Sequence, residues 1–194
     1  MKKKLLPFIN EVYIKCLDGT NYRELILNKF KRKDYEEWLK KTCGQKIGNS
    51  TLLNDTTSQC ASFTAFCTSK SSFGNMSIVD FYYIQKSVIS DLFIVYVKSK
   101  VVMRYSSGNI IYPETLIISP ESIYKTFFSE AHKLITNHYP NARFVSFSIL
   151  KKDFSLEPSE FLDHRSNYYG VLFGYEGDIT KLNMIGEHHF RFQV

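Results

Sequence analysis

The chain lacks the motifs by which metal sites and the commoner hydrolases are recognised. Its four cysteines form no Cys-x-x-Cys pair, and no histidine stands near them in sequence, so neither a zinc site nor a disulfide framework is predicted. It also has no Gly-x-Ser-x-Gly nucleophile elbow and no phosphate-binding loop. We therefore expect free thiols in a reducing compartment and no bound metal.

Long apolar stretches are also missing. The run at residues 5–9 is interrupted by Asn10 and Glu11, which makes it too short for the core of a signal peptide. No later run approaches the roughly 20 residues of a membrane-spanning helix. The expectation is a cytoplasmic protein without a membrane span.

Histidine is scarce, with five in the chain and none before His132. His188 and His189 are adjacent on a predicted strand, so their side chains should point to opposite faces. His132 and His138 stand six apart on a predicted helix, whereas residues three or four apart share a helix face. No pair of histidines is therefore predicted to share a metal ion.

Apolar and aromatic side chains are abundant, at 44% and 15% of the residues. That content can bury a substantial core in a single domain without disulfides or metals. Lysine and arginine number 25 against 19 aspartates and glutamates, which gives a formal charge of +6. Such an excess permits an anionic partner: nucleic acid, a membrane surface or a phosphorylated cofactor.

Much of the positive charge lies in the N-terminal third of the chain. Residues 21–41 have a helical pattern that breaks near Lys33 and Asp34, and the polar stretches 44–58 and 68–75 are expected to be loops. We predict a helical and loop extension over residues 1–75, packed on a core formed by residues 76–194. The basic residues concerned are Lys2, Lys3, Lys4, Lys29, Lys31, Arg32, Lys33, Lys40, Lys41 and Lys46.

Apolar, β-branched and aromatic runs predict strands at four places in the core. These are residues 78–84, 92–97, 101–105 and 110–118, with residues 98–100 as a connection. A helix is predicted over 123–138 and another strand over 143–150. The helix has one apolar stripe of helical period, formed by Ile123, Phe127, Phe128, Ala131, Leu134 and Ile135. The predicted fold class is α/β (α+β), a single domain with a mixed, mostly antiparallel sheet and a central amphipathic helix.

The segment Tyr112-Pro-Glu-Thr-Leu-Ile-Ile-Ser-Pro-Glu121 precedes this helix, and Tyr139-Pro-Asn-Ala-Arg-Phe-Val-Ser-Phe-Ser148 follows it. This order of elements resembles the central part of the Gcn5-related N-acetyltransferase fold. The resemblance covers roughly residues 92–175 and is one of element order more than of identity. It implies an acetyltransferase-like core in which residues 154–164 form a short helix and residues 168–175 an aromatic-rich strand.

The resemblance also implies a cofactor site at the start of the helix. In that family the helix N-terminus holds the coenzyme pyrophosphate, because glycines let backbone amides approach the phosphates. The corresponding segment here is Glu121-Ser-Ile-Tyr-Lys-Thr126, which contains no glycine. By position, the resemblance assigns Ser122, Ile123 and Lys125 to the cofactor, which would be acyl-CoA or an acyl carrier.

Acyl transfer needs a base to deprotonate the amine and an acid to protonate the leaving thiolate. The resemblance implies Glu114 as the base and Tyr168 or Tyr169 as the acid. The expected function is transfer of an acyl group from acyl-CoA or an acyl carrier to an amine.

A non-enzymatic binding or regulatory module on the same scaffold fits the sequence as well. The basic N-terminal helix carries four aromatic residues among its lysines, a composition that suits phosphate contact and base stacking. Nucleic acid, another anionic ligand or a protein partner could bind there. Lys125 and Arg143, near the two ends of the central helix, are expected anion contacts under either hypothesis.

A third hypothesis is a papain-like cysteine hydrolase that pairs Cys60 or Cys67 with His188 or His189. Residues 59–66 are similar to the nucleophile segment of papain-like enzymes, although the position that matches the nucleophile is Phe63.

Overall fold

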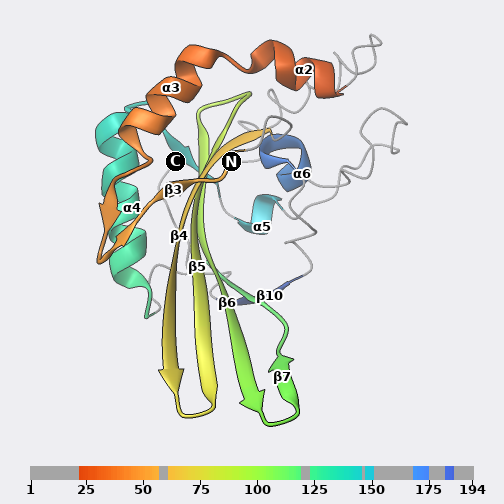
Figure 1. The fold of residues 1–194 in the computed structure, drawn as a ribbon. Coiled ribbons are helices and arrows are strands. Elements are labelled where there is room, and N and C mark those ends of the chain that lie inside the picture. Colours follow the sequence, from red (N-terminus) through yellow and green to blue (C-terminus); the bar gives the residue numbers. More distant parts are fainter. Residues whose placement is uncertain are drawn as a thin grey trace.

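The computed structural model describes residues 22–56, 61–118, 123–145, 147–150, 168–174 and 182–185. Over these residues, helices pack on both faces of a mixed sheet of eight strands (Figure 1). Most strand pairs are antiparallel, and one long amphipathic helix covers the centre of one face. The predicted fold class is confirmed, while the acetyltransferase-like core stays a prediction.

The described residues form helices, a main sheet and a separate hairpin. The helices are α2 (Tyr22–Lys29), α3 (Arg32–Lys41), α4 (Lys125–His138), α5 (Phe147–Leu150) and α6 (Tyr168–Phe173). The strands of the main sheet are β3 (Leu53–Asn54), β4 (Ser62–Phe73), β5 (Met76–Ser87), β6 (Leu92–Tyr105), β7 (Gly108–Ile111), β8 (Thr115–Ile117), β9 (Arg143–Phe144) and β10 (Asn183–Ile185). Strands β1 (Lys46–Ile47) and β2 (Ser50–Thr51) form a separate hairpin.

Three long strands, β4, β5 and β6, form an antiparallel meander at the centre of the sheet. β6 runs unbroken for 14 residues, so the predicted division into strands 92–97 and 101–105 was wrong. Residues 98–100 pair with β5, and residues 98 and 99 also pair with β8. The helices leave this part of the sheet uncovered. Its side chains can therefore be polar, because a strand in contact with solvent needs no apolar residues.

Strand β4 continues through residues 68–73, which were expected to be a loop. That prediction was wrong for the same reason, since serine, threonine and lysine are compatible with a strand whose faces meet solvent. The chain turns back at Gly74 and Asn75, and Gly74 has the positive φ of 60° that a tight hairpin turn requires. The expected boundary between residues 75 and 76 falls in this β4–β5 hairpin.

The free edge of β6 carries three short strands end to end. β7 pairs antiparallel with the C-terminal part of β6, and β8 pairs antiparallel with the middle of β6. β9 pairs parallel with the first residues of β6. The expected strand 110–118 is divided into β7 and β8 by residues 112–114, where Pro113 lacks the N–H that a ladder needs. β10, which was not predicted, pairs parallel with β8.

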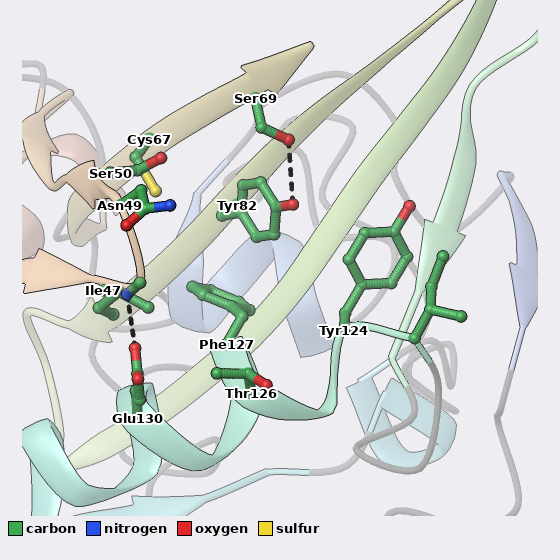
Figure 2. Close-up of a pocket in the computed structure, with 12 residues that line it drawn as sticks. Ile47, Asn49, Ser50, Cys67, Ser69, Tyr82, Tyr124, Thr126, Phe127 and Glu130 are labelled. Carbon is green, nitrogen blue, oxygen red and sulfur yellow. Dashed lines mark hydrogen bonds between the residues drawn. The ribbon is translucent and has the colours of Figure 1, made fainter. Parts of the chain in front are cut away.

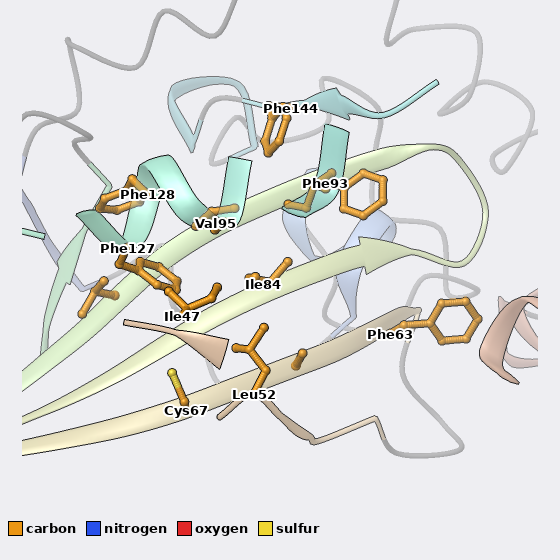
Figure 3. Close-up of a cluster of buried hydrophobic side chains, with 14 of the residues drawn as sticks. Ile47, Leu52, Phe63, Cys67, Ile84, Phe93, Val95, Phe127, Phe128 and Phe144 are labelled. Atoms are coloured by element: carbon orange, nitrogen blue, oxygen red, sulfur yellow. The ribbon is translucent and has the colours of Figure 1, made fainter. Parts of the chain in front are cut away.

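One face of the sheet, called the α4 face, bears the side chains of Phe63, Cys67, Ile84, Phe93 and Val95. Helix α4 confirms the predicted amphipathic helix, and Phe127 and Phe128 of its apolar stripe pack on this face (Figure 3). Trp38 of α3 belongs to the same cluster. Ile123 was expected in the stripe, but it precedes the helix and is exposed, so that part of the prediction was wrong. The N-terminal helical segment breaks at Phe30 and Lys31 and not at the expected Lys33. Residues 44–58, expected to be a loop, include β1, β2 and β3.

The other face, called the α6 face, packs against α5 and α6. Two strand predictions here were wrong: residues 143–150 form β9 followed by α5, and residues 168–173 form α6. Tyr169, Leu172 and Phe173 are all buried, at the helical spacing of three and four residues. The aromatic content suggested a strand, but burial on one helical face decides the conformation. Residues 154–164 lie outside the described part of the chain, as does the predicted strand that carries His188 and His189.

No helix of the described residues is long and apolar enough to cross a membrane.

Candidate functional site

A pocket of about 260 Å³ opens beside the first turn of α4, where the sequence resemblance implies a cofactor site. Figure 2 shows its walls: the turn between β1 and β2 on one side, strands β4 and β5 behind, and α4 on the other side. We call it the α4 pocket. Its lining mixes apolar side chains such as Ile47 and Phe127 with hydroxyls and the Cys67 thiol.

Two hydrogen-bonded side-chain pairs organise the polar part of this region. Tyr124 Oη donates a hydrogen bond of 2.9 Å to Oδ1 of Asp80, whose side chain is almost buried at 8% exposure. Tyr82 Oη and Ser69 Oγ lie 3.1 Å apart (Figure 2). These contacts arise because Ser69 and Asp80 are paired across β4 and β5, directly below the start of α4.

The pKa values of three groups that line the α4 pocket, Tyr124, Tyr82 and Cys67, are raised. Burial raises the pKa of Tyr124 to about 12, and the neighbouring Asp80 adds to that shift. Burial also raises the pKa of Tyr82, and it raises the pKa of the Cys67 thiol to about 11. Near neutral pH these three residues therefore offer the pocket neutral hydroxyl and thiol groups. The Glu130 carboxylate also lines the pocket.

The wall formed by the β1–β2 turn is attached to α4. The Gly48 N–H donates a 2.6 Å hydrogen bond to Oε2 of Glu130, one turn into the helix. Gly48 has a positive φ of 58°, which a residue with a side chain adopts only with strain. A glycine and a glutamate that are far apart in sequence thus set the width of the pocket.

Of the expected cofactor residues that the structure describes, Ile123 belongs to the lining of this pocket and Lys125 does not. Ile123 lines it and is 91% exposed, while Lys125 is exposed in the first turn of α4. Ser122 lies outside the described residues. Glu114, the expected base, is half-buried in the connection between β7 and β8.

Tyr169, the expected acid, lies on the opposite side of the sheet from the α4 pocket. It is 3% exposed, and its hydroxyl donates a 3.0 Å hydrogen bond to Oε1 of Gln85. Gln85 Nε2 in turn donates to Thr64 Oγ1 at 3.3 Å on the α6 face. The structure does not bring Tyr169 together with Ile123 and Lys125. Tyr168 starts α6, and its side chain is outside the described part.

A second, more polar pocket of about 650 Å³ lies beyond the C-terminal end of α4. It is lined by the α2–α3 junction, the end of β5 with the turn into β6, and the connection from α4 to β9. We call it the cationic pocket. Its charged residues are Lys29, Lys31, Lys86, Arg143, Asp34 and Asp91.

Lys86 is the unusual member of this group. Its ammonium lies 5.6 Å from the centre of the Phe63 ring and 5.9 Å from that of Phe93. Burial lowers its pKa, against the opposing effect of nearby carboxylates, chiefly that of Asp91. A cation held against apolar rings and partly removed from water gains from any counter-charge that enters the pocket.

The Ser90 hydroxyl also lines the cationic pocket. Its oxygen is buried and makes no hydrogen bond within the described residues. A buried hydroxyl normally has a hydrogen-bond partner, so Ser90 Oγ is suited to contact a ligand held in this pocket.

The hydrolase hypothesis depends on residues of which only Cys67 is described. Cys67 is buried on β4 and holds its proton, whereas a nucleophilic cysteine needs a lowered pKa. Cys60, His188 and His189 lie outside the described residues. No group of three metal-ligating side chains occurs in the ranges that the structure describes.

Asp80 and Lys86 are the site residues that sequence reasoning missed. Both stand on β5 at even positions with Tyr82 and Ile84, so they share the α4 face of the sheet. The sequence did contain a signal for them, because each is a charged residue at a position of β5 where the alternating pattern calls for an apolar one. Lys125 and Arg143, expected as anion contacts, stand at opposite ends of α4, and only Arg143 joins the cationic pocket.

Comparisons with family models, with curated proteins and with solved structures found no match to this chain. The geometry of the two pockets is therefore the basis for a functional proposal.

Proposed function

We propose that this protein is a binding module for a phosphorylated or similarly anionic small molecule, which it holds in the cationic pocket. The observation that carries the proposal is the convergence of Lys29, Lys31, Lys86 and Arg143 from three separate segments on one concave site. Asp34 and Asp91 offset two of these four charges, which leaves an excess of two. A phosphate monoester carries close to that charge.

Two further features of the cationic pocket support an anion over a neutral ligand. The partly desolvated Lys86 ammonium is stabilised by a negative charge, since desolvation strengthens the attraction between charges. The exposed Arg143 can present the planar fork that binds phosphate with two parallel hydrogen bonds. A pocket of about 650 Å³ falls in the range typical of small-molecule sites.

The test is isothermal titration of the full chain with inorganic phosphate, pyrophosphate and ATP. Arg143→Gln should weaken binding about tenfold, the loss expected for one charge-assisted hydrogen-bond pair. Lys86→Met should weaken it as well. Lys133→Gln is the matched control, because Lys133 is an exposed lysine of α4 outside the pocket. Equal losses in the control, or no binding of any of the three anions, would contradict the proposal.

Acyl transfer is a second proposal, supported by the position of the α4 pocket beside Ile123 and the first turn of α4. Its neutral hydroxyls and apolar wall suit a thioester arm. Acetyl-CoA should then raise the melting temperature, and Lys125→Gln should reduce that shift while Arg143→Gln leaves it intact. The opposite pattern would place the coenzyme phosphates in the cationic pocket and favour binding alone.

A further inference from the structure

The central strands continue past the helices as a projecting arm. We define the arm as residues 68–79 and 98–111, the outer parts of β4, β5 and β6 together with β7. Figure 1 shows these strands extending beyond α4 to two hairpin turns at the far end. The turns contain Gly74 and Gly108, both with positive φ.

One side of the arm is apolar. Phe73, Met76, Met103 and Ile110 lie directly opposite one another across the four strands, so their side chains form one continuous row. Ile78 and Val101 form part of the next row inward. Phe73 is 59% exposed and Ile110 is 51% exposed. An apolar row of this width on a solvated surface is typical of an interaction site.

A polar row separates this surface from the core beneath α4. Ser69, Asp80, Ser99 and Thr115 are aligned across β4, β5, β6 and β8, one step inward from Ile78 and Val101. Tyr124 bonds to Asp80 at this row, and α4 begins immediately after it. The apolar end of the arm is therefore a distinct surface, not an exposed margin of the core.

The charge of the arm has a single sign. Its residues include Lys70, Lys98, Lys100 and Arg104 and no aspartate or glutamate. By the strand register these four side chains lie on the side opposite the apolar row. Two lysines cover aromatic rings there: Lys98 Nζ lies 5.1 Å from the Tyr83 centroid and Lys100 Nζ 4.9 Å from the Phe81 centroid.

We propose that the arm docks end-first on an anionic lipid surface, with its apolar tips in the membrane interface and its cations at the headgroups. Phe73 lies three residues beyond Lys70, and Met103 three beyond Lys100. At about 3.3 Å per strand residue the tips reach about 10 Å past these lysines. Interfacial segments insert about 5–10 Å, so the offset of the tips from Lys70 and Lys100 matches the depth of the headgroup layer. Arg104 lies one residue beyond Met103, and its long side chain can reach back to the headgroups.

The chemistry of the arm favours lipid over nucleic acid. Phe81 and Tyr83 lie beneath lysine side chains, so they are poorly placed to stack on bases. At the tip, Phe73 is flanked by the aliphatic and thioether side chains of Met76, Met103 and Ile110, and such a mixed apolar row suits acyl chains. The absence of acidic residues from the arm is complementary to an anionic surface. The apolar row and the four cations of the arm line neither pocket, so the inference is independent of the proposed function.

The test is co-sedimentation of the full chain with phosphatidylcholine vesicles, with and without phosphatidylserine. Wild-type protein should bind only the anionic vesicles. The tip variant Phe73→Ser/Ile110→Ser and the charge variant Lys70→Gln/Lys100→Gln should each bind at least tenfold more weakly. Leu53→Ser is the control, because Leu53 is similarly exposed at 55% on β3, outside the arm. Circular dichroism establishes that each variant folds.

A second measurement reports insertion directly. The only tryptophan of the chain, Trp38, is fully buried. A tryptophan introduced at the tip would therefore be the only one whose fluorescence a quencher in the membrane can reach. Brominated phosphatidylserine vesicles should quench Phe73→Trp and should not quench Leu53→Trp.

Three results would overturn the lipid proposal. The first is that the protein does not bind anionic vesicles at low salt. The second is that the tip variant binds them as tightly as the wild type. The third is that the protein binds a single-stranded oligonucleotide and anionic vesicles do not displace it.

Discussion

Tyr124 and Asp80 are joined by a 2.9 Å hydrogen bond that connects the start of α4 to the middle of β5, 44 residues earlier in the chain. The bond satisfies a carboxylate that is almost fully buried, and it lies where the packed core ends and the projecting arm begins. It therefore fixes the first turn of α4 on the sheet, next to the α4 pocket.

Removing the Tyr124 hydroxyl should destabilise the fold. Tyr124→Phe leaves the buried Asp80 carboxylate without this donor, which costs about 1–3 kcal/mol of unfolding free energy. Urea denaturation measures the loss. Tyr105→Phe is the matched control, because Tyr105 is 46% exposed on the arm. Equal losses in both variants would show that the Tyr124–Asp80 bond has no special importance.

The Tyr169 hydroxyl should matter for stability through its bond to Gln85. Tyr169→Phe leaves the buried Gln85 acceptor unpaired and should cost about 1–3 kcal/mol. A double-mutant cycle with Gln85→Leu should show coupling, since replacing both partners by apolar groups removes the unpaired atom. Additive losses in urea denaturation would argue against this account. If Tyr169 is instead a catalytic acid, its loss should abolish acyl transfer at unchanged stability.

The described cysteines should react slowly with thiol reagents in the folded protein. Burial raises the pKa of both Cys43 and Cys67 to about 11, so very little thiolate is present near neutral pH. Alkylation followed by peptide mass spectrometry should find both largely unmodified in native protein and fully modified in denaturant. Rapid labelling of native Cys67 would revive it as a candidate nucleophile.

The protein should lose stability in alkaline solution. The folded-state pKa is raised from 10.0 to about 12 for Tyr124 and Tyr139, and from 9.0 to about 11 for Cys67. The unfolded chain therefore releases these protons first, so stability is complete below about pH 9 and is lost as the pH rises through 11 and 12.

Thermal unfolding between pH 8 and 12 measures this decline. Tyr139→Phe removes one of the groups, so its melting temperature should fall less steeply with pH than that of the wild type. An unchanged slope would mean that Tyr139 does not contribute. Lys86 acts in the opposite direction, because its lowered pKa lets the unfolded chain hold more protons and favours folding as the pH rises.

Local periodicity was enough to predict part of the fold. The apolar stripe identified α4 because one helical face is buried from Phe127 to Ile135, although Ile123, its expected first member, lies exposed before the helix. The strand cores of β5 and β6 were also evident from their β-branched and aromatic residues. Residues 68–73 and 98–100 were missed, because exposed strands carry the same polar residues as loops. Helix α6 was missed because its aromatics suggested a strand.

The sequence by itself determined the composition of the arm, the amphipathic face of α4 and the positive charge of the chain. Each of these is a property of residues that are close together in the sequence, so composition and short-range periodicity are enough to predict it. Only the tertiary structure decided that Lys29, Lys86 and Arg143 share one pocket, and that Tyr169 and Ile123 lie on opposite sides of the sheet. Those relationships depend on strand register and on the packing of helices across the sheet, which bring together residues that no local pattern connects.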